Sequence, residues 1–189
     1  SDAERTPAKF DVSGLPTPVL PQLTHEAWNV VFTGVGGTGV TTVAAVLAMA
    51  AHVDGKASQT LDMTGLAQKN GAVVSHVRIA DVPASLYATR IAAGEATLVL
   101  ACDILTGVGY ESIAKMQRGV SKALVNAGLV MPADFTRKPD LQFPLGSMER
   151  EISDAVATGD AEFLDATTLA TRLMGDSIAT NLFMVGFAY

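Results

Sequence analysis

The sequence predicts an α/β fold: a Rossmann-like, mostly parallel sheet flanked by helices, with an extended N-terminal linker. Three observations predict it. Short apolar segments alternate with longer segments of helical character along the 189 residues. Most strand-like segments are apolar on both sides, as in parallel strands that are covered on both faces. A glycine cluster directly follows the first of them, at the point where a helix begins.

Residues 1–28 are predicted to be a linker or an arm that wraps onto the domain, because they hold four of the eight prolines and no periodic apolar face. The domain itself is predicted over 29–189. Asn29–Thr33 is a short apolar run, hence a buried strand. Small and aliphatic residues then run without a breaker over Thr38–Asp54, which predicts a helix closed by Gly55.

Ser58–Leu61 is predicted as the second strand and Met63–Gly71 as a polar loop. Ala72–Ala80 alternates, which predicts a strand with a wetter side that carries Val74, His76 and Arg78. Because proline is tolerated in a first helical turn, a helix is expected from Pro83 to near Gly94. Thr97–Cys102 is largely apolar and is predicted as a strand.

The remaining elements follow the same alternation. They are a helix over Tyr110–Arg118, a strand over Lys122–Asn126, an irregular excursion over 127–145 with three prolines, a helix over Met148–Thr158, a short strand over Phe163–Asp165, and helices over Ala166–Met174 and Ser177–Tyr189. The last helix is apolar nearly all round, so we expect it to be sandwiched within the domain or against a neighbour.

The composition limits the classes of partner. With 13 Lys and Arg against 19 Asp and Glu, the net charge is −6. This balance argues against nucleic acid and against a membrane surface, since both attract basic patches. No apolar stretch reaches the ~18 residues of a membrane span and no signal peptide is visible, which favours a cytoplasmic protein.

The apolar content of 49% is high for a domain that stands alone. We therefore expect part of the surface to be covered, by sister domains or in a homo-oligomer. Because the chain opens on Ser1, we also expect it to be a piece of a longer polypeptide. The single cysteine, Cys102, excludes an internal disulfide and any four-cysteine zinc or iron–sulfur site. It follows an apolar run, so we interpret it as a buried strand-end residue.

The glycine cluster is the clearest candidate for a binding site. Its residues of interest are Gly34, Gly36, Gly37, Thr38 and Gly39, and the glycines at 34, 36 and 39 match the G-x-G-x-x-G spacing. Glycines allow a tight turn and close approach of a diphosphate to backbone N–H groups at the helix start. The alternative is a tight strand–helix corner that binds nothing. The Lys-Ser/Thr of a P-loop is absent, which argues against nucleotide hydrolysis.

An acidic residue lies where a ribose contact would be expected: Asp62 comes 23 residues after Gly39. Asp103, Asn126 and Asp165 each follow an apolar run, and each is either a ligand contact or a cap or turn residue.

His52 and His76 are interpreted as ordinary packed or surface histidines rather than catalytic bases. No nucleophile–base pair or two-histidine metal spacing is evident. We therefore predict no catalytic and no metal-binding residue in this chain.

Several motifs together resemble one known family. They are the run Phe32–Val40, the segments Leu61–Lys69, Ser75–Ile79, Ala92–Ala96 and Ala133–Arg137, and the stretch Gly175–Asn181. They resemble the gamma domain of the 2-oxoacid:ferredoxin oxidoreductases, and most closely that of the indolepyruvate:ferredoxin oxidoreductases. The resemblance covers roughly residues 28–189.

The resemblance implies part of a multidomain enzyme that oxidatively decarboxylates an aryl 2-oxoacid to an acyl-CoA and passes electrons to ferredoxin. It places thiamine diphosphate, Mg²⁺ and [4Fe-4S] clusters in sister domains, and the glycine loop near the path of CoA. Many gamma subunits carry arginine ahead of the glycine that closes the Met63–Gly71 loop, where this chain has Lys69. Lysine would meet a CoA phosphate more weakly than an arginine fork does.

Three functions follow from these readings. The first is the accessory gamma domain, inactive in isolation. The second is a dehydrogenase domain that binds NAD(P) or FAD, which needs a substrate domain and an acid/base group. The third is a docking module whose glycine loop binds nothing.

Overall fold

A mixed sheet of six strands forms the centre of the computed structural model, which describes residue 14 and the ranges 26–64, 71–128 and 144–189. The strands are β1 (Trp28–Val35), β2 (Ala57–Thr64), β3 (Ala72–Ala80), β4 (Leu98–Ala101), β5 (Lys122–Asn126) and β6 (Ala161–Leu164), in the order β2-β3-β1-β4-β5-β6. The ladders from β1 through β4 and β5 to β6 are parallel, whereas β3 runs antiparallel to both β1 and β2. The predicted α/β class is confirmed.

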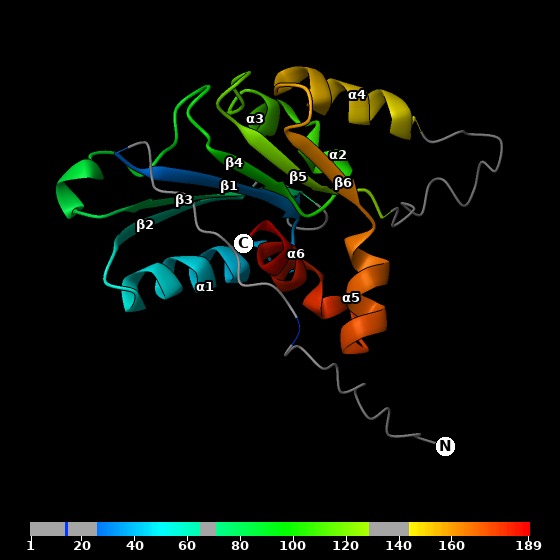
Figure 1. Cartoon of the computed structure of the whole chain (residues 1–189), viewed down its shortest axis with the longest axis horizontal. Coiled ribbons are helices and arrows are strands. Elements are labelled where there is room, and N and C mark those ends of the chain that lie inside the picture. The colour runs from blue at the N-terminus through cyan, green and yellow to red at the C-terminus, as the bar shows by residue number, and fades with distance from the viewer. Residues whose placement is uncertain (1–13, 15–25, 65–70, 129–143) are drawn as a thin grey trace.

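Helices cover both faces of this sheet (Figure 1). One face carries α1 (Val40–Val53), α5 (Ala166–Met174) and α6 (Thr180–Ala188), and the other carries α2 (Ile104–Gly107), α3 (Tyr110–Ile113) and α4 (Leu145–Ala155). Alternate residues of β1 supply the two cores: Val30 and Phe32 pack on the α1 side and Val31 on the α4 side. Among the described residues, no helix is both long and apolar enough to cross a bilayer.

The wetter side predicted for β3 is wrong. His76 is fully buried and Arg78 is 3% exposed, because β3 lies between β1 and β2 and the segment after it folds back over this face. That segment was predicted to be a helix from Pro83 to Gly94, which is also wrong: only a single 3₁₀ turn forms, Pro83–Ser85. The backbone beyond it is held instead by side chains of β3.

Two hydrogen bonds explain the irregular backbone. The Ile91 N–H donates to Nδ1 of His76 at 3.1 Å, and Nη1 of Arg78 donates to the Ala88 carbonyl at 2.6 Å. These tertiary contacts take the place of intrahelical ones.

Two helical predictions change in extent. The helix expected over Tyr110–Arg118 is a single turn, α3, and α2 before it was not predicted. The last helix divides into a 3₁₀ turn at Ser177–Ala179 and α6. The predicted linker lies outside the described residues apart from residues 14 and 26–28, as do Lys69 and the motif Ala133–Arg137.

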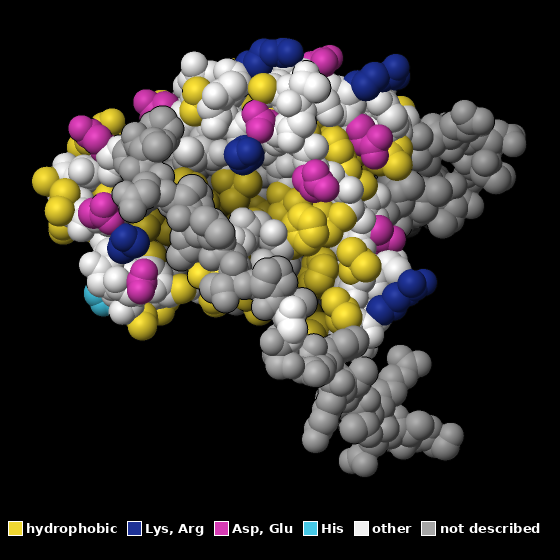
Figure 2. Space-filling view, viewed as in Figure 1, with side chains coloured by type: hydrophobic (Ala, Val, Ile, Leu, Met, Phe, Trp, Pro, Cys, Tyr) yellow, Lys and Arg dark blue, Asp and Glu magenta, His cyan; other side chains and the backbone are white. Residues whose placement is uncertain are grey.

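The end of the chain leaves apolar side chains exposed. Met184 packs fully into the core, whereas Ile178, Leu182 and Tyr189 are 84, 52 and 71% exposed. In the space-filling view, hydrophobic side chains gather over the α5–α6 region (Figure 2). The described part of the domain thus covers one side of α6 and not the other.

Candidate functional site

The glycine loop joins the end of β1 to the start of α1, and its first glycine is required by packing. A Cβ on Gly34 would lie 2.6 Å from Cγ2 of Val40 and 3.0 Å from Cβ of Cys102. Only a residue without a side chain lets α1 and the end of β4 approach the strand so closely. Gly34 therefore shapes the corner from within the core.

The other glycines serve different ends. The Gly36 N–H donates to the Gly71 carbonyl at 2.9 Å, and a Cβ on Gly36 would lie 3.2 Å from that same oxygen. Gly37 and Gly39 both have φ +88°, a conformation that L side chains rarely adopt, and no atom lies near where their Cβ atoms would be. Gly36 thus ties the loop to the residue just before β3, while Gly37 and Gly39 leave open space beside a left-handed backbone.

Thr38 and the last helix hold the loop in place. The Thr38 hydroxyl donates to the Val35 carbonyl at 2.7 Å, and Nδ2 of Asn181 donates to the Thr38 carbonyl at 2.9 Å. Asn181 is 6% exposed and comes from α6, far away in the sequence. No role was predicted for Asn181, although the residue closes the motif Gly175–Asn181.

A hollow of about 230 Å³ lies beside this loop. It is lined by Val35, Gly37, Gly39, Val40, Thr41, Thr42 and Val73. The first N–H groups of an α-helix have no intrahelical acceptor and carry the positive end of the helix dipole. α1 has 14 residues and no side-chain cap, so its first turn can offer these donors to an anion. No charged side chain is among these lining residues.

The acidic residue proposed for ribose contact lies further from the loop than in a dinucleotide-binding fold. Asp62 pairs with Ser75 of β3, which pairs with Phe32 of β1. β3 therefore separates Asp62 from β1 by two strand spacings, about 10 Å. The loop and Asp62 are not brought together as neighbours, and Lys69 lies outside the described residues.

The polar residues at the strand ends act in the structure as caps and braces. Asp103 accepts the Thr106 N–H at the start of α2, and Asp165 accepts the Thr168 N–H at the start of α5, both at 2.9 Å. Hydrogen bonds from the side chain and then from the backbone N–H of Thr168 hold the pKa of Asp165 below its usual value. The Asn126 amide donates to the Cys102 carbonyl and accepts from Ala166 N–H, at 3.1 Å each, which joins β4 to the start of α5.

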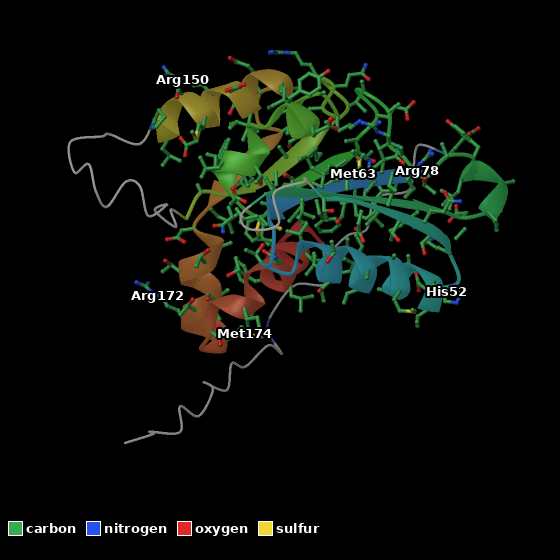
Figure 3. The ribbon with its side chains drawn as sticks, turned by 180° about the vertical axis from the view of Figure 1, so that it is seen from behind. His52, Met63, Arg78, Arg150, Arg172 and Met174 are labelled. Carbon is green, nitrogen blue, oxygen red and sulfur yellow. The ribbon has the colours of Figure 1, made fainter. Side chains whose placement is uncertain are left out.

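The remaining candidates for reactive groups are packed or remote. Cys102 is 7% exposed, and burial, with Asp103 beside it, raises the pKa of its thiol to about 12. Burial, and then the charges of Lys115 and Arg90, lowers the pKa of His76 to about 4, so the imidazole is neutral at pH 7. His52 is exposed near the end of α1 (Figure 3). Within the described ranges, no three His, Cys, Asp or Glu side chains group as a metal site.

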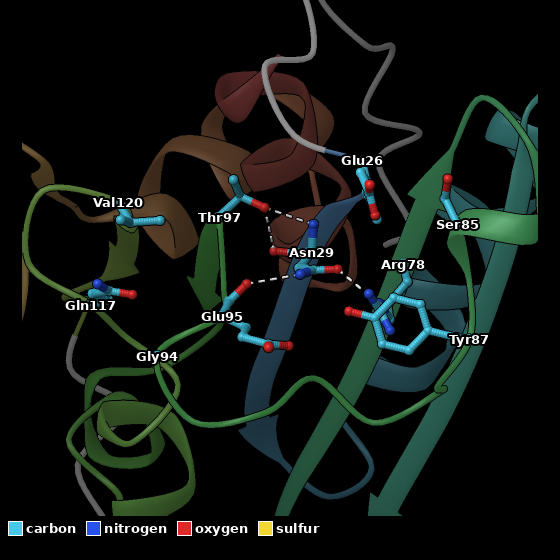
Figure 4. Close-up of a pocket in the computed structure, with 11 residues that line it drawn as sticks. Glu26, Asn29, Arg78, Ser85, Tyr87, Gly94, Glu95, Thr97, Gln117 and Val120 are labelled. Atoms are coloured by element: carbon cyan, nitrogen blue, oxygen red, sulfur yellow. Dashed lines mark hydrogen bonds between the residues drawn. The ribbon is translucent and has the colours of Figure 1, made fainter.

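A larger hollow, of about 330 Å³, lies where β1 begins (Figure 4). Arg78 lines it together with Asn29, Tyr87, Glu26 and Glu95. Arg78 belongs to the motif Ser75–Ile79. Because this face of β3 was predicted to be wet, the sequence did not indicate that Arg78 lines a pocket.

The profile of the pyruvate ferredoxin/flavodoxin oxidoreductase family matches residues 29–189. The chain belongs to this family. It is 28% identical over 165 residues to the indolepyruvate oxidoreductase subunit IorB of Archaeoglobus fulgidus, a match that covers 85% of this chain and 75% of that protein. The predicted resemblance to a gamma-type domain of the 2-oxoacid:ferredoxin oxidoreductases is thereby confirmed.

Two solved structures share the fold of this family member. The gamma subunit of a keto/oxoacid ferredoxin oxidoreductase from Geobacter sulfurreducens matches with a TM-score of 0.51 and 21% identity, over 82% of this chain and 71% of that one. The 2-oxoglutarate:ferredoxin oxidoreductase from Magnetococcus marinus, solved with 2-oxoglutarate, coenzyme A and succinyl-CoA bound, matches with a TM-score of 0.58 and 16% identity. That match covers 84% of this chain and 23% of the other.

Proposed function

We propose that this gamma-type domain binds the diphosphate of CoA at its glycine loop, as the accessory domain of an oxidoreductase that converts an aryl 2-oxoacid to an acyl-CoA. The hollow at the start of α1 carries the proposal, because it offers backbone donors beside two glycines in the left-handed conformation. The Magnetococcus enzyme of the same fold holds CoA and succinyl-CoA, and the Archaeoglobus relative is named for indolepyruvate.

The residues of the hollow fit a phosphate group in a specific way. The N–H groups of the first turn of α1 would donate to phosphate oxygens, and the bare Cα atoms of Gly37 and Gly39 would let the ligand approach the backbone. Because no charged side chain is among the lining residues, attraction would come from the helix dipole and from Lys69, which we propose as a further phosphate contact. Asp62 would meet only a part of the ligand that extends across β3.

The other chemistry is proposed for sister domains. Thiamine diphosphate with Mg²⁺ would act on the 2-oxoacid there, and [4Fe-4S] clusters would carry electrons to ferredoxin. The described strand ends of this chain support that division, because Asp103, Asn126 and Asp165 are committed to capping and bracing. They leave no described acid/base pair beside the glycine loop, which disfavours the alternative of a complete dehydrogenase domain.

A pair of isosteric substitutions in the whole enzyme tests the loop. Asn and Asp tolerate positive φ better than other residues, so Gly37→Asn and Gly37→Asp should both fold and should differ mainly in charge. A carboxylate next to a phosphate adds a repulsion of about 1–3 kcal/mol. We therefore expect Gly37→Asp to raise the KM for CoA roughly 5- to 150-fold above that of Gly37→Asn, with the KM for the 2-oxoacid unchanged.

Gly159 provides the matched control, because it has φ +86° and open space around it but lies in the turn before β6. Gly159→Asp and Gly159→Asn should give the same KM for CoA. An equal KM for CoA in the two Gly37 variants would remove the loop from the CoA site. Gly36→Val is a poorer probe, because its side chain would press on the Gly71 carbonyl before it met a ligand.

A further inference from the structure

The larger hollow lies at the opposite edge of the sheet from the glycine loop. Asn29 is the second residue of β1 and Thr97 directly precedes β4, so the hollow opens at the amino ends of two parallel strands. The glycine loop follows the carboxyl end of β1. A ligand in one hollow would therefore not occupy the other, and binding at the larger hollow is independent of CoA binding at the glycine loop.

A buried guanidinium lines this hollow. Arg78 is 3% exposed, in contrast to Arg150 and Arg172, which project from α4 and α5 (Figure 3). Its Nε donates to Oδ1 of Asn29 at 2.9 Å and its Nη1 to the Ala88 carbonyl, and the ring of Tyr87 lies over it at 5.1 Å. Asn29 is itself fixed, since its Nδ2 donates to the Glu95 carbonyl at 2.9 Å. The guanidinium is thus held rigidly in one orientation.

The charge of Arg78 has no ion-pair partner among the described residues. An arginine has five N–H donors, and only two of these have acceptors in the described part of the chain. A cation withdrawn from water is costly unless an anion compensates it. The remaining donors suit a planar carboxylate, which guanidinium groups bind with two parallel hydrogen bonds.

Two carboxylates flank the same hollow. Glu26 precedes β1 and Glu95 precedes β4, and both are exposed. In the close-up, their side chains approach the hollow around Asn29 and Arg78 from opposite sides (Figure 4). Two negative charges and one positive charge disfavour the binding of a simple anion, because repulsion by the two glutamates offsets its attraction to Arg78. A ligand that carries both signs satisfies all three groups.

We propose that this hollow binds a free α-amino acid in its zwitterionic form. The carboxylate lies on the open N–H groups of Arg78, and the ammonium lies between Glu26 and Glu95. The side chain of the amino acid then contacts Val120, which also lines the hollow and is 39% exposed. A volume of about 330 Å³ is at the lower end for small-molecule sites, as a single amino acid requires.

Three compounds of similar shape test the contributions of the carboxylate and of the ammonium group separately. L-Phenylalanine carries both, phenylpyruvate has a keto group in place of the ammonium, and 2-phenylethylamine lacks the carboxylate. Isothermal titration of the 189-residue chain should show phenylalanine binding at least about tenfold more tightly than either analogue. L-Alanine should also bind, because the charged groups are the same. Absence of heat with both amino acids, or phenylpyruvate binding as tightly as phenylalanine, would overturn the proposal.

Conservative variants test the assigned groups. Glu26→Gln together with Glu95→Gln keeps the shape of exposed side chains, so the fold should persist, and the affinity for phenylalanine should fall at least about tenfold. Glu151→Gln, on the exposed side of α4, should leave it unchanged. Equal affinities in the double variant and the control would overturn the ammonium site. Arg78→Lys should also lower the affinity for phenylalanine, with unaltered far-UV circular dichroism as evidence that the variant is folded. An unaltered affinity in this variant would overturn the carboxylate site.

Discussion

Gly34→Ala separates the packing role of the glycine motif from its binding role. The substitution places a methyl group 2.6 Å from Cγ2 of Val40 and 3.0 Å from Cβ of Cys102, both in the core. Overpacking of this kind costs about 1–3 kcal/mol, while loss of chain entropy in the unfolded state returns about 0.5 kcal/mol. The backbone at Gly34 has no positive φ, so the expected net loss of about 0.5–2.5 kcal/mol in the free energy of unfolding is steric.

A double-mutant cycle identifies the contact responsible. Val40→Ala removes the methyl group nearest to the new Cβ, so Gly34→Ala should cost about 1 kcal/mol less in that background than in the native one. Urea unfolding followed by the fluorescence of the single tryptophan, Trp28 at the start of β1, measures both values. Gly186→Ala in α6 is the control: it meets no atom within 4 Å and should stabilise the chain slightly.

Two results would refute this reasoning. The first is a Gly34→Ala variant as stable as the native chain, which would mean that α1 shifts away from β1 without cost. The second is a coupling with Val40→Ala near zero, which would place the strain elsewhere than in the predicted contact.

The remaining predictions concern acid stability, association and redox content. The pKa of His76 is lowered from 6.5 to about 4 in the folded state. Its neutral imidazole therefore contributes up to about 3 kcal/mol to the free energy of unfolding above pH 6.5, and this contribution is lost as the pH falls towards 4. His76→Asn should flatten the pH dependence of urea unfolding between these values, and an unaltered slope would contradict this prediction. The chain should self-associate at micromolar concentrations through its exposed apolar end, and Ile178→Lys with Leu182→Lys should make it monomeric in sedimentation runs; a native chain that is already monomeric throughout would exclude this. The purified chain, with Cys102 as its single cysteine, should be colourless and should not turn over indolepyruvate with thiamine diphosphate and CoA, and stoichiometric iron and sulfide after chelation would show otherwise.

Local patterns were sufficient wherever the interaction that decides the structure is also local. The apolar run at Lys122–Asn126 and the segment Ala166–Met174 appear as predicted, because a buried strand and a short helix each follow from their own composition. The glycine loop was found by its spacing, since the tight turn from β1 into α1 demands glycine at particular positions. Asp103 and Asp165 were recognised as candidate caps for the same reason.

Local sequence patterns gave wrong predictions where contacts between residues far apart in the chain decide the structure. Alternation in β3 predicted a wet face, but the segment after Pro83 covers it, and that segment is irregular because His76 and Arg78 bind its backbone. Arg78 also lines the larger hollow, which the sequence did not indicate.

The sequence by itself determined the α/β class, the family resemblance and the position of the loop, because periodicity and glycine spacing act over a few residues. Only the tertiary structure decided that β3 stands between Asp62 and the loop, since strand order depends on pairing between segments far apart in the chain. It also decided that Asn181 of α6 holds the loop from the other end of the chain, through a hydrogen bond that no local pattern can specify.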